Sequence, residues 1–228
     1  MFDVFTPDVL GALWRGTTIT LSLTVLASLF GLALGLVAAM GRLSRLAPLR
    51  FLAGVYIETF RGTPLLVQLF FLYFALPQIT GVTLPAYQTA VLGLSLFAGA
   101  YAAEIIRGSL NAVPRGQLEA ARALGLKPSE ALRLVLIPQA ARVGLPALGN
   151  QFIGLLKDSS LASVITVTEL LLTTRGLVSI NYQPVAMYLA VGLIYFLLSN
   201  GAARLFGLVE RRLERPYVTS SARTRTPA

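Results

Sequence analysis

The chain has 228 residues, of which 55% are hydrophobic and 13% charged, and its mean hydropathy is +0.72. A soluble domain carries about 25% charged residues, so a compact water-soluble fold is excluded. A disordered chain is also excluded, because disorder requires low hydrophobicity. The absence of cysteine and histidine excludes disulfides, thiolate metal sites and a histidine base. The composition predicts an all-α membrane protein with one domain.

Five stretches are long and apolar enough to cross a bilayer, whose hydrocarbon core needs about 20 helical residues. The first, 16–41, contains no charge, and the acidic residues before it are unlike a signal peptide. The charge-free stretch 62–103 is too long for one helix and is divided by Pro77, Gly81 and Pro85. The predicted spans are therefore 16–41, 51–76, 84–106, 143–168 and 180–203.

Basic residues alternate between the two sides of these spans. Fifteen lysines and arginines follow the first, third and fifth spans, whereas Arg15 and Arg175 lie on the opposite side. Positive charge stays cytoplasmic, so the N-terminus is expected outside and the C-terminus inside. The net charge of +9 is then explained by the basic residues that fix the orientation in the membrane, and nucleic-acid binding is not expected. A single transmembrane domain is expected to cover 1–218, with a disordered cytoplasmic tail at 219–228.

The segment 107–142 mixes charged and small residues and is expected to face the cytoplasm. Pro114 suits a first helical turn, so a short helix is predicted over 115–124 with Gly125 at its C-terminal cap. A second helix is expected to start at 127–129. In the first helix Glu119, Ala120 and Ala121 combine a carboxylate with two minimal side chains, so a partner could approach closely. A plain solvated surface helix is the alternative.

The order of residues in this segment resembles the EAA loop of ABC-importer permeases. Glu119-Ala120-Ala121 is followed by Gly125 and then by Val135-Leu136-Ile137-Pro138, where Val135 and Ile137 replace the usual isoleucine and leucine. Further stretches resemble the polar amino-acid branch, the histidine/glutamine/arginine-type permeases of the MetI-like family. These are 61–68 (RGTPLLVQ), 100–104 (AYAAE), 138–140 (PQA) and 155–161 (LLKDSSL), in which Ser159 stands where threonine is usual.

The resemblance implies a non-catalytic permease subunit of a bacterial inner-membrane importer for polar amino acids. It implies a cytoplasmic ATPase dimer coupled through Glu119, Ala120, Ala121, Gly125 and Pro138. It also implies a second permease, identical or related, and an extracytoplasmic substrate-binding protein. No Gly-x-x-x-x-Gly-Lys-Ser/Thr motif occurs, so ATP and magnesium are expected on the partner ATPase, with no cofactor or metal on this chain.

Several polar residues lie within or at the ends of the predicted spans and are candidates for a substrate path. A charge at a helix centre costs about 3 kcal/mol unless it is paired or hydrated, and a zwitterionic amino acid needs both an anion and a hydrogen-bond donor. Structural ion pairing is the alternative; Glu58 and Arg61, three residues apart, can pair locally. The candidates are Glu58, Arg61, Gln68, Glu104, Lys157, Asp158 and Ser160.

Two other functions compete with the importer permease. A self-contained secondary transporter or channel for a small polar solute would not need the helix that carries Glu119. A membrane-embedded enzyme is disfavoured, because histidine, cysteine and paired-carboxylate motifs are absent. The pair Gly31 and Gly35 has the small-xxx-small spacing of closely packed helices and is expected to serve packing.

Overall fold

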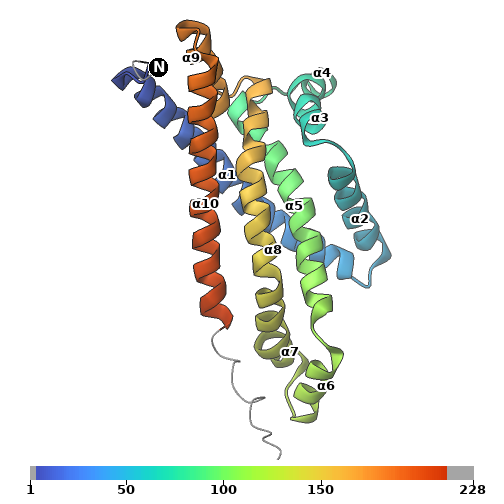
Figure 1. Cartoon of the computed structure of the whole chain (residues 1–228). Helices are drawn as coiled ribbons and strands as arrows, with labels where there is room; N and C mark the ends of the chain where they lie inside the picture. The colour runs from blue at the N-terminus through green and yellow to red at the C-terminus, as the bar shows by residue number, and fades with distance from the viewer. Residues whose placement is uncertain (1–3, 215–228) are drawn as a thin grey trace, which may run out of the picture.

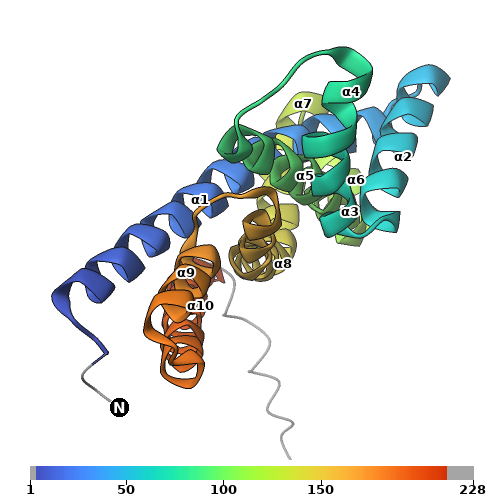
Figure 2. The same cartoon turned by 90° about the horizontal axis from the view of Figure 1, so that it is seen from above.

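The computed structural model describes residues 4–214, and all regular secondary structure in this part of the chain is helical. Helices α5 (Ala86–Ala112), α8 (Ile137–Asp158) and α10 (Pro184–Glu214) run side by side, and α1 (Pro7–Leu43) crosses them obliquely (Figures 1 and 2). The short helices α6 (Arg115–Ala123) and α7 (Pro128–Ala131) lie at one end of the molecule. The described N-terminus and α9 (Leu170–Asn181) lie at the other end (Figure 1).

Shorter elements connect the long helices. Between α1 and α5 the chain forms α2 (Ala47–Gly62), α3 (Leu65–Phe70), a π-helical turn η1 (Phe71–Ala75) and α4 (Leu76–Thr80). A second π-helical turn, η2 (Leu132–Leu136), joins α7 to α8, and the 3₁₀ helix η3 (Ser159–Ile165) follows α8. Each π turn ends two residues before a proline, Pro77 or Pro138, where the missing N–H interrupts regular α-helical bonding.

Four described helical stretches are long and apolar enough to cross a membrane, and a bent pair makes up to five. The bent pair corrects the sequence-based prediction of one continuous helix over 51–76. Helix α2 ends at Gly62, and the next helical segment, starting at Leu65, turns by 108°. Proline disfavours helical geometry in the residue before it, and Thr63, which precedes Pro64, is extended. The predicted tail at 219–228 lies outside the described residues.

The crossing of α1 and α5 depends on small side chains. A Cβ added at Gly31 would lie 2.8 Å from the Ala98 Cβ, and one at Gly35 would lie 2.6 Å from the Ala102 Cβ. Such distances are too short for carbon atoms, so the two helices approach as closely as they do because glycine occupies both positions. The packing role predicted for Gly31 and Gly35 is confirmed.

Two apolar clusters pack the half of the bundle that holds the described N-terminus and α9. One joins α1, α3, α5 and the 3₁₀ helix through buried residues that include Leu23, Leu69 and Leu94. The other joins the start of α1 to α9 and α10 through Leu13 and Met187. By contrast, many large apolar side chains along α1 and α10 are exposed, as expected where the solvent is lipid.

Candidate functional site

Helix α6 presents a small exposed face at one end of the molecule. Glu119 and Ala120 are exposed, and Leu124, directly after the helix, is 85% exposed. Ala121 is only 4% exposed and packs inside the chain, so this member of the predicted coupling group supports the helix from behind. The exposed face therefore consists of a carboxylate, small side chains and one projecting leucine, which suits docking into a groove.

The ends of α6 are fixed by local chemistry. Gly125 has φ +85°, and its N–H donates to the Arg122 carbonyl at 2.9 Å. Such a left-handed residue costs a side-chain-bearing amino acid about 1–2 kcal/mol, so the predicted glycine cap is confirmed. At the next helix, the Lys127 N–H donates to the Glu130 carboxylate at 2.8 Å.

Helix α6 is also connected to the start of α8. The Gln139 side-chain amide donates to the side-chain amide oxygen of Gln117 at 3.3 Å. Pro138, the last member of the predicted coupling group, is exposed beside Gln139 in the first turn of α8. This contact joins α6 to the foot of a long apolar helix.

Three ion pairs occur among the described residues, and they differ from the local pairing considered for Glu58 and Arg61. Glu58 pairs instead with Arg42 of α1 at 3.1 Å. Arg61 lies 3.7 Å from Glu104 of α5, which also binds Arg107 at 2.7 Å. Of the path candidates, the structure thus brings Arg61 and Glu104 together, and it places Glu58 in a separate pair at the α1–α2 contact.

A groove of about 400 Å³ lies between α5 and α8. Its lining includes Tyr101 from α5 and Gln151 and Asp158 from α8. The Arg61 guanidinium carbon lies 5.3 Å from the Tyr101 ring centroid, within the range of a cation–π contact. The groove therefore combines one carboxylate with aromatic and apolar walls, and Arg61 stacks on one of those walls.

The remaining path candidates lie elsewhere. The Gln68 side-chain amide donates to the Phe60 and Thr63 carbonyl oxygens at 2.9 and 3.0 Å, and to the Thr63 hydroxyl at 2.9 Å. Gln68 therefore holds the bend between α2 and α3. Lys157 is exposed at the end of α8, and the hydroxyl of Ser160 donates to its backbone carbonyl at 2.7 Å.

A buried carboxylate that the sequence analysis missed connects three elements. Glu169 is 0% exposed and accepts bonds from the N–H groups of Leu171 and Leu172 at 2.9 and 2.8 Å, which caps α9. It also accepts from the hydroxyls of Tyr195 in α10, at 3.0 Å, and Thr20 in α1, at 3.4 Å. An acidic residue directly before an uncharged apolar run is the sequence signal that could have revealed this cap.

Glu169 lies outside the membrane-spanning helices, in the segment that joins α8 to α10. Burial raises the pKa of its carboxyl above the ordinary value, although the hydrogen bonds from the two backbone amides, Tyr195 and Thr20 oppose that rise. The described residues contain no group of three or more acidic side chains that could hold a metal ion.

Comparison with known proteins identifies the family. The family model described as the binding-protein-dependent transport system inner membrane component matches residues 31–215. The chain is 42% identical over 201 residues to the L-cystine transport system permease protein of Bacillus subtilis (strain 168), covering 88% of this chain and 86% of that one. It is 36% identical over 200 residues to the arginine transport system permease protein of the same organism, covering 88% and 91%.

Solved structures agree with this result. A chain from the crystal structure of an amino acid ABC transporter with histidines superposes with a TM-score of 0.85 and 41% identity, covering 90% of this chain and 95% of that one. A chain of the inward-facing MetNI methionine ABC transporter shares the fold, with a TM-score of 0.75, 22% identity and coverage of 92% and 100%. This chain belongs to the family of binding-protein-dependent transport system inner membrane components.

Proposed function

We propose that this chain is the permease subunit of an ATP-binding-cassette importer that moves polar amino acids across a bacterial cytoplasmic membrane. The observation that carries the proposal is the 41% identity and TM-score of 0.85 to a chain of an amino acid ABC transporter. The relatives that transport cystine and arginine support the amino-acid class. The basic residues at the end that holds α6 and α7 support a cytoplasmic location for that end.

Energy for transport comes from a separate ATPase dimer in this proposal. The exposed face of α6, with Glu119, Ala120 and Leu124, docks on that ATPase, while Ala121 holds the helix against the chain. Gly125 keeps the end of α6 sharply defined. ATP-driven movement of α6 reaches α8 through the Gln139–Gln117 contact and the turn at Pro138.

The substrate path runs along the groove between α5 and α8, facing a second permease that is identical or related. Asp158 offers a carboxylate to the ammonium group of an amino acid. Arg61 stays beside the groove because it is shared between Glu104 and the Tyr101 ring. Lys157 lies at the outer end of α8 and Ser160 in the 3₁₀ helix that follows it, where an extracytoplasmic binding protein delivers substrate. Transport follows when the two access states bind the substrate differently.

The test is ATP-dependent uptake of labelled histidine, glutamine, arginine and cystine by proteoliposomes that contain the chain, its ATPase, any partner permease and the binding protein. Glu119→Lys reverses a charge on the docking face and is expected to lower uptake at least tenfold while the chain remains folded. Arg45→Glu, an exposed charge reversal in the α1–α2 connection, is the matched control and is expected to leave uptake within twofold.

The same assay separates the proposal from its rival. A self-contained secondary transporter would move substrate without the ATPase and would tolerate Glu119→Lys. Uptake that persists when the ATPase is omitted, or that is driven by an ion gradient alone, would refute the importer function.

A further inference from the structure

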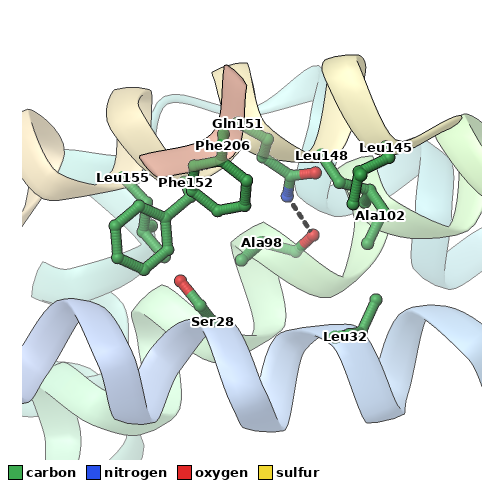
Figure 3. A pocket seen from close by; sticks show the side chains of 10 residues that line it. All are labelled: Ser28, Leu32, Ala98, Ala102, Leu145, Leu148, Gln151, Phe152, Leu155 and Phe206. Carbon is green, nitrogen blue, oxygen red and sulfur yellow. Dashed lines mark hydrogen bonds between the residues drawn. The ribbon is translucent and has the colours of Figure 1, made fainter. Parts of the chain in front are cut away.

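A cavity in the membrane-spanning region contains two polar atoms that the transport function does not use. The cavity has a volume of about 160 Å³ and lies between α1, α5, α8 and α10, with mainly apolar walls that include Phe152 and Phe206 (Figure 3). Its two polar atoms are the Ser28 hydroxyl oxygen and the Gln151 side-chain carbonyl oxygen. Both are buried and have no hydrogen-bond partner among the described residues.

The orientation of Ser28 is unusual for this protein. The hydroxyls of Ser22, Thr24, Ser95 and Ser109 each donate to a helix carbonyl three or four residues earlier, at 2.6–2.8 Å. Ser28 makes no such bond, and its oxygen points away from the α1 backbone toward the Phe152 ring (Figure 3). A buried hydroxyl without a hydrogen-bond partner lowers the stability of the folded state. Because the Ser28 hydroxyl points into the cavity, we infer that a polar group in the cavity satisfies it.

Gln151 presents its oxygen in a similar way. Its amide nitrogen donates to the Ala98 carbonyl of α5, which orients the side chain across the space between α5 and α8 (Figure 3). The amide oxygen points away from that bond and is left as an acceptor. The cavity therefore offers one hydroxyl, which can donate or accept, and one carbonyl oxygen, which can only accept.

The size and position of the cavity limit the occupant. A protein cavity of about 150 Å³ holds benzene, so the body of the ligand is close to one six-membered ring. Ser28 lies at the middle of the uncharged run 16–41, and Leu32, which lines the cavity, is 45% exposed on the surface of the chain. A ligand that enters past Leu32 at this depth of the span passes through hydrocarbon, a route that excludes charged and zwitterionic molecules such as the transported amino acid.

We propose that this cavity binds a small neutral amphiphile from the bilayer, with a ring-sized apolar body and one hydroxyl group. The hydroxyl accepts a bond from Ser28 or donates one to Gln151. Gln151, Ala98 and Leu155 also line the groove between α5 and α8, so the cavity and the groove share a wall. A bound molecule stabilises the arrangement of these helices and is expected to slow the transport cycle.

Binding can be measured without relying on the proposed function. The probe is 4-fluorophenol, and its binding to the fully assembled transporter in lipid nanodiscs is followed by fluorine NMR, with protein-free nanodiscs to subtract partitioning into lipid. Fluorobenzene, which has the same ring without the hydroxyl, is the matched ligand. We expect saturable, protein-dependent binding of 4-fluorophenol, about threefold to tenfold tighter than fluorobenzene, as one net hydrogen bond provides.

Variants locate the probe. Ser28→Leu fills the cavity and is expected to abolish binding of both ligands, whereas Ser28→Ala should lower only the preference for 4-fluorophenol. Phe30→Leu, on the exposed side of the same helix, is the control and should change neither affinity. If the Ser28→Leu variant fails to assemble, Leu148→Phe takes its place in the experiment, because it fills the same cavity from α8.

Three results would overturn the proposal. No protein-dependent binding of 4-fluorophenol would mean that the cavity holds only water or is covered by the second permease. Binding that survives both filling variants would place the ligand elsewhere. Equal affinity for the two ligands, unaffected by Ser28→Ala, would show an apolar void in which Ser28 and Gln151 recognise nothing.

Discussion

Replacing Glu169 with alanine should destabilise the end of the bundle that holds α9 more than any surface change. The carboxylate accepts four hydrogen bonds, two from the backbone amides of Leu171 and Leu172 in the first turn of α9 and two from the hydroxyls of Tyr195 and Thr20. Loss of a helix cap costs about 0.5–2 kcal/mol, and each buried donor left without a partner costs about 1–3 kcal/mol. Because water can reach some of the released groups, we expect Glu169→Ala to lower the unfolding free energy by about 3–5 kcal/mol.

The measurement is thermal unfolding of the purified chain in nanodiscs, followed by circular dichroism. For a domain of this size, about 4 kcal/mol corresponds to a lower melting temperature by roughly 8–16 °C. Glu169→Gln keeps one acceptor oxygen and should lose less. Glu58→Ala is the control, because its carboxylate is 73% exposed and its pair with Arg42 is worth about 0–1 kcal/mol. A loss below about 1 kcal/mol for Glu169→Ala would refute the idea that this carboxylate connects α1, α9 and α10.

Three further outcomes are expected. The pKa of Glu169 is raised in the folded state, so proton binding to this carboxyl stabilises the folded protein. The stabilisation is complete below the ordinary glutamate pKa of about 4.3 and is lost as the pH rises through the raised pKa. The melting temperature of Glu169→Gln should lack this decline with pH. Parallel pH profiles of melting temperature for the variant and the unmodified chain would contradict the expectation. Gly35→Ala should lower the unfolding free energy by about 1–3 kcal/mol, because the added methyl group pushes α1 away from α5. Gly192→Ala, with open space around it, should be neutral or stabilising in the same melting assay. Gly125→Ala should lower ATP-dependent uptake severalfold by straining the cap of α6, and Gly116→Ala, also in open space, should not.

Much of the fold could be predicted because lipid imposes simple rules on the sequence. The long uncharged runs around 16–41 and 180–203 correspond to helices, and Gly125 identified the end of α6. The bend at Pro64 could not be predicted from hydropathy. The apolar run continues through the proline, and a hydropathy average contains no information on the direction of the helix axis. The sequence does contain one indication of this bend: Thr63 precedes a proline, and a residue before proline favours extended over helical geometry.

The candidate site was harder to predict because its contacts join distant segments. Glu58 and Arg61 are near neighbours in sequence, yet each pairs with a residue on another helix. Gln68 carries the bend between α2 and α3, and Glu169 connects residues about 150 and 26 positions away. Such pairings depend on how helices cross, which no local pattern contains.

The oblique course of α1 makes the protein sensitive to membrane thickness. The uncharged run 16–41 rises about 39 Å as an α-helix, whereas a typical hydrocarbon core is about 30 Å thick, so the run fits when the helix is inclined by roughly 40°. A thicker bilayer favours a steeper helix. Because Gly31 and Gly35 fix α1 against α5, such hydrophobic mismatch acts directly on the helix that lines the groove. Acyl-chain length is thereby connected mechanically to the geometry of transport.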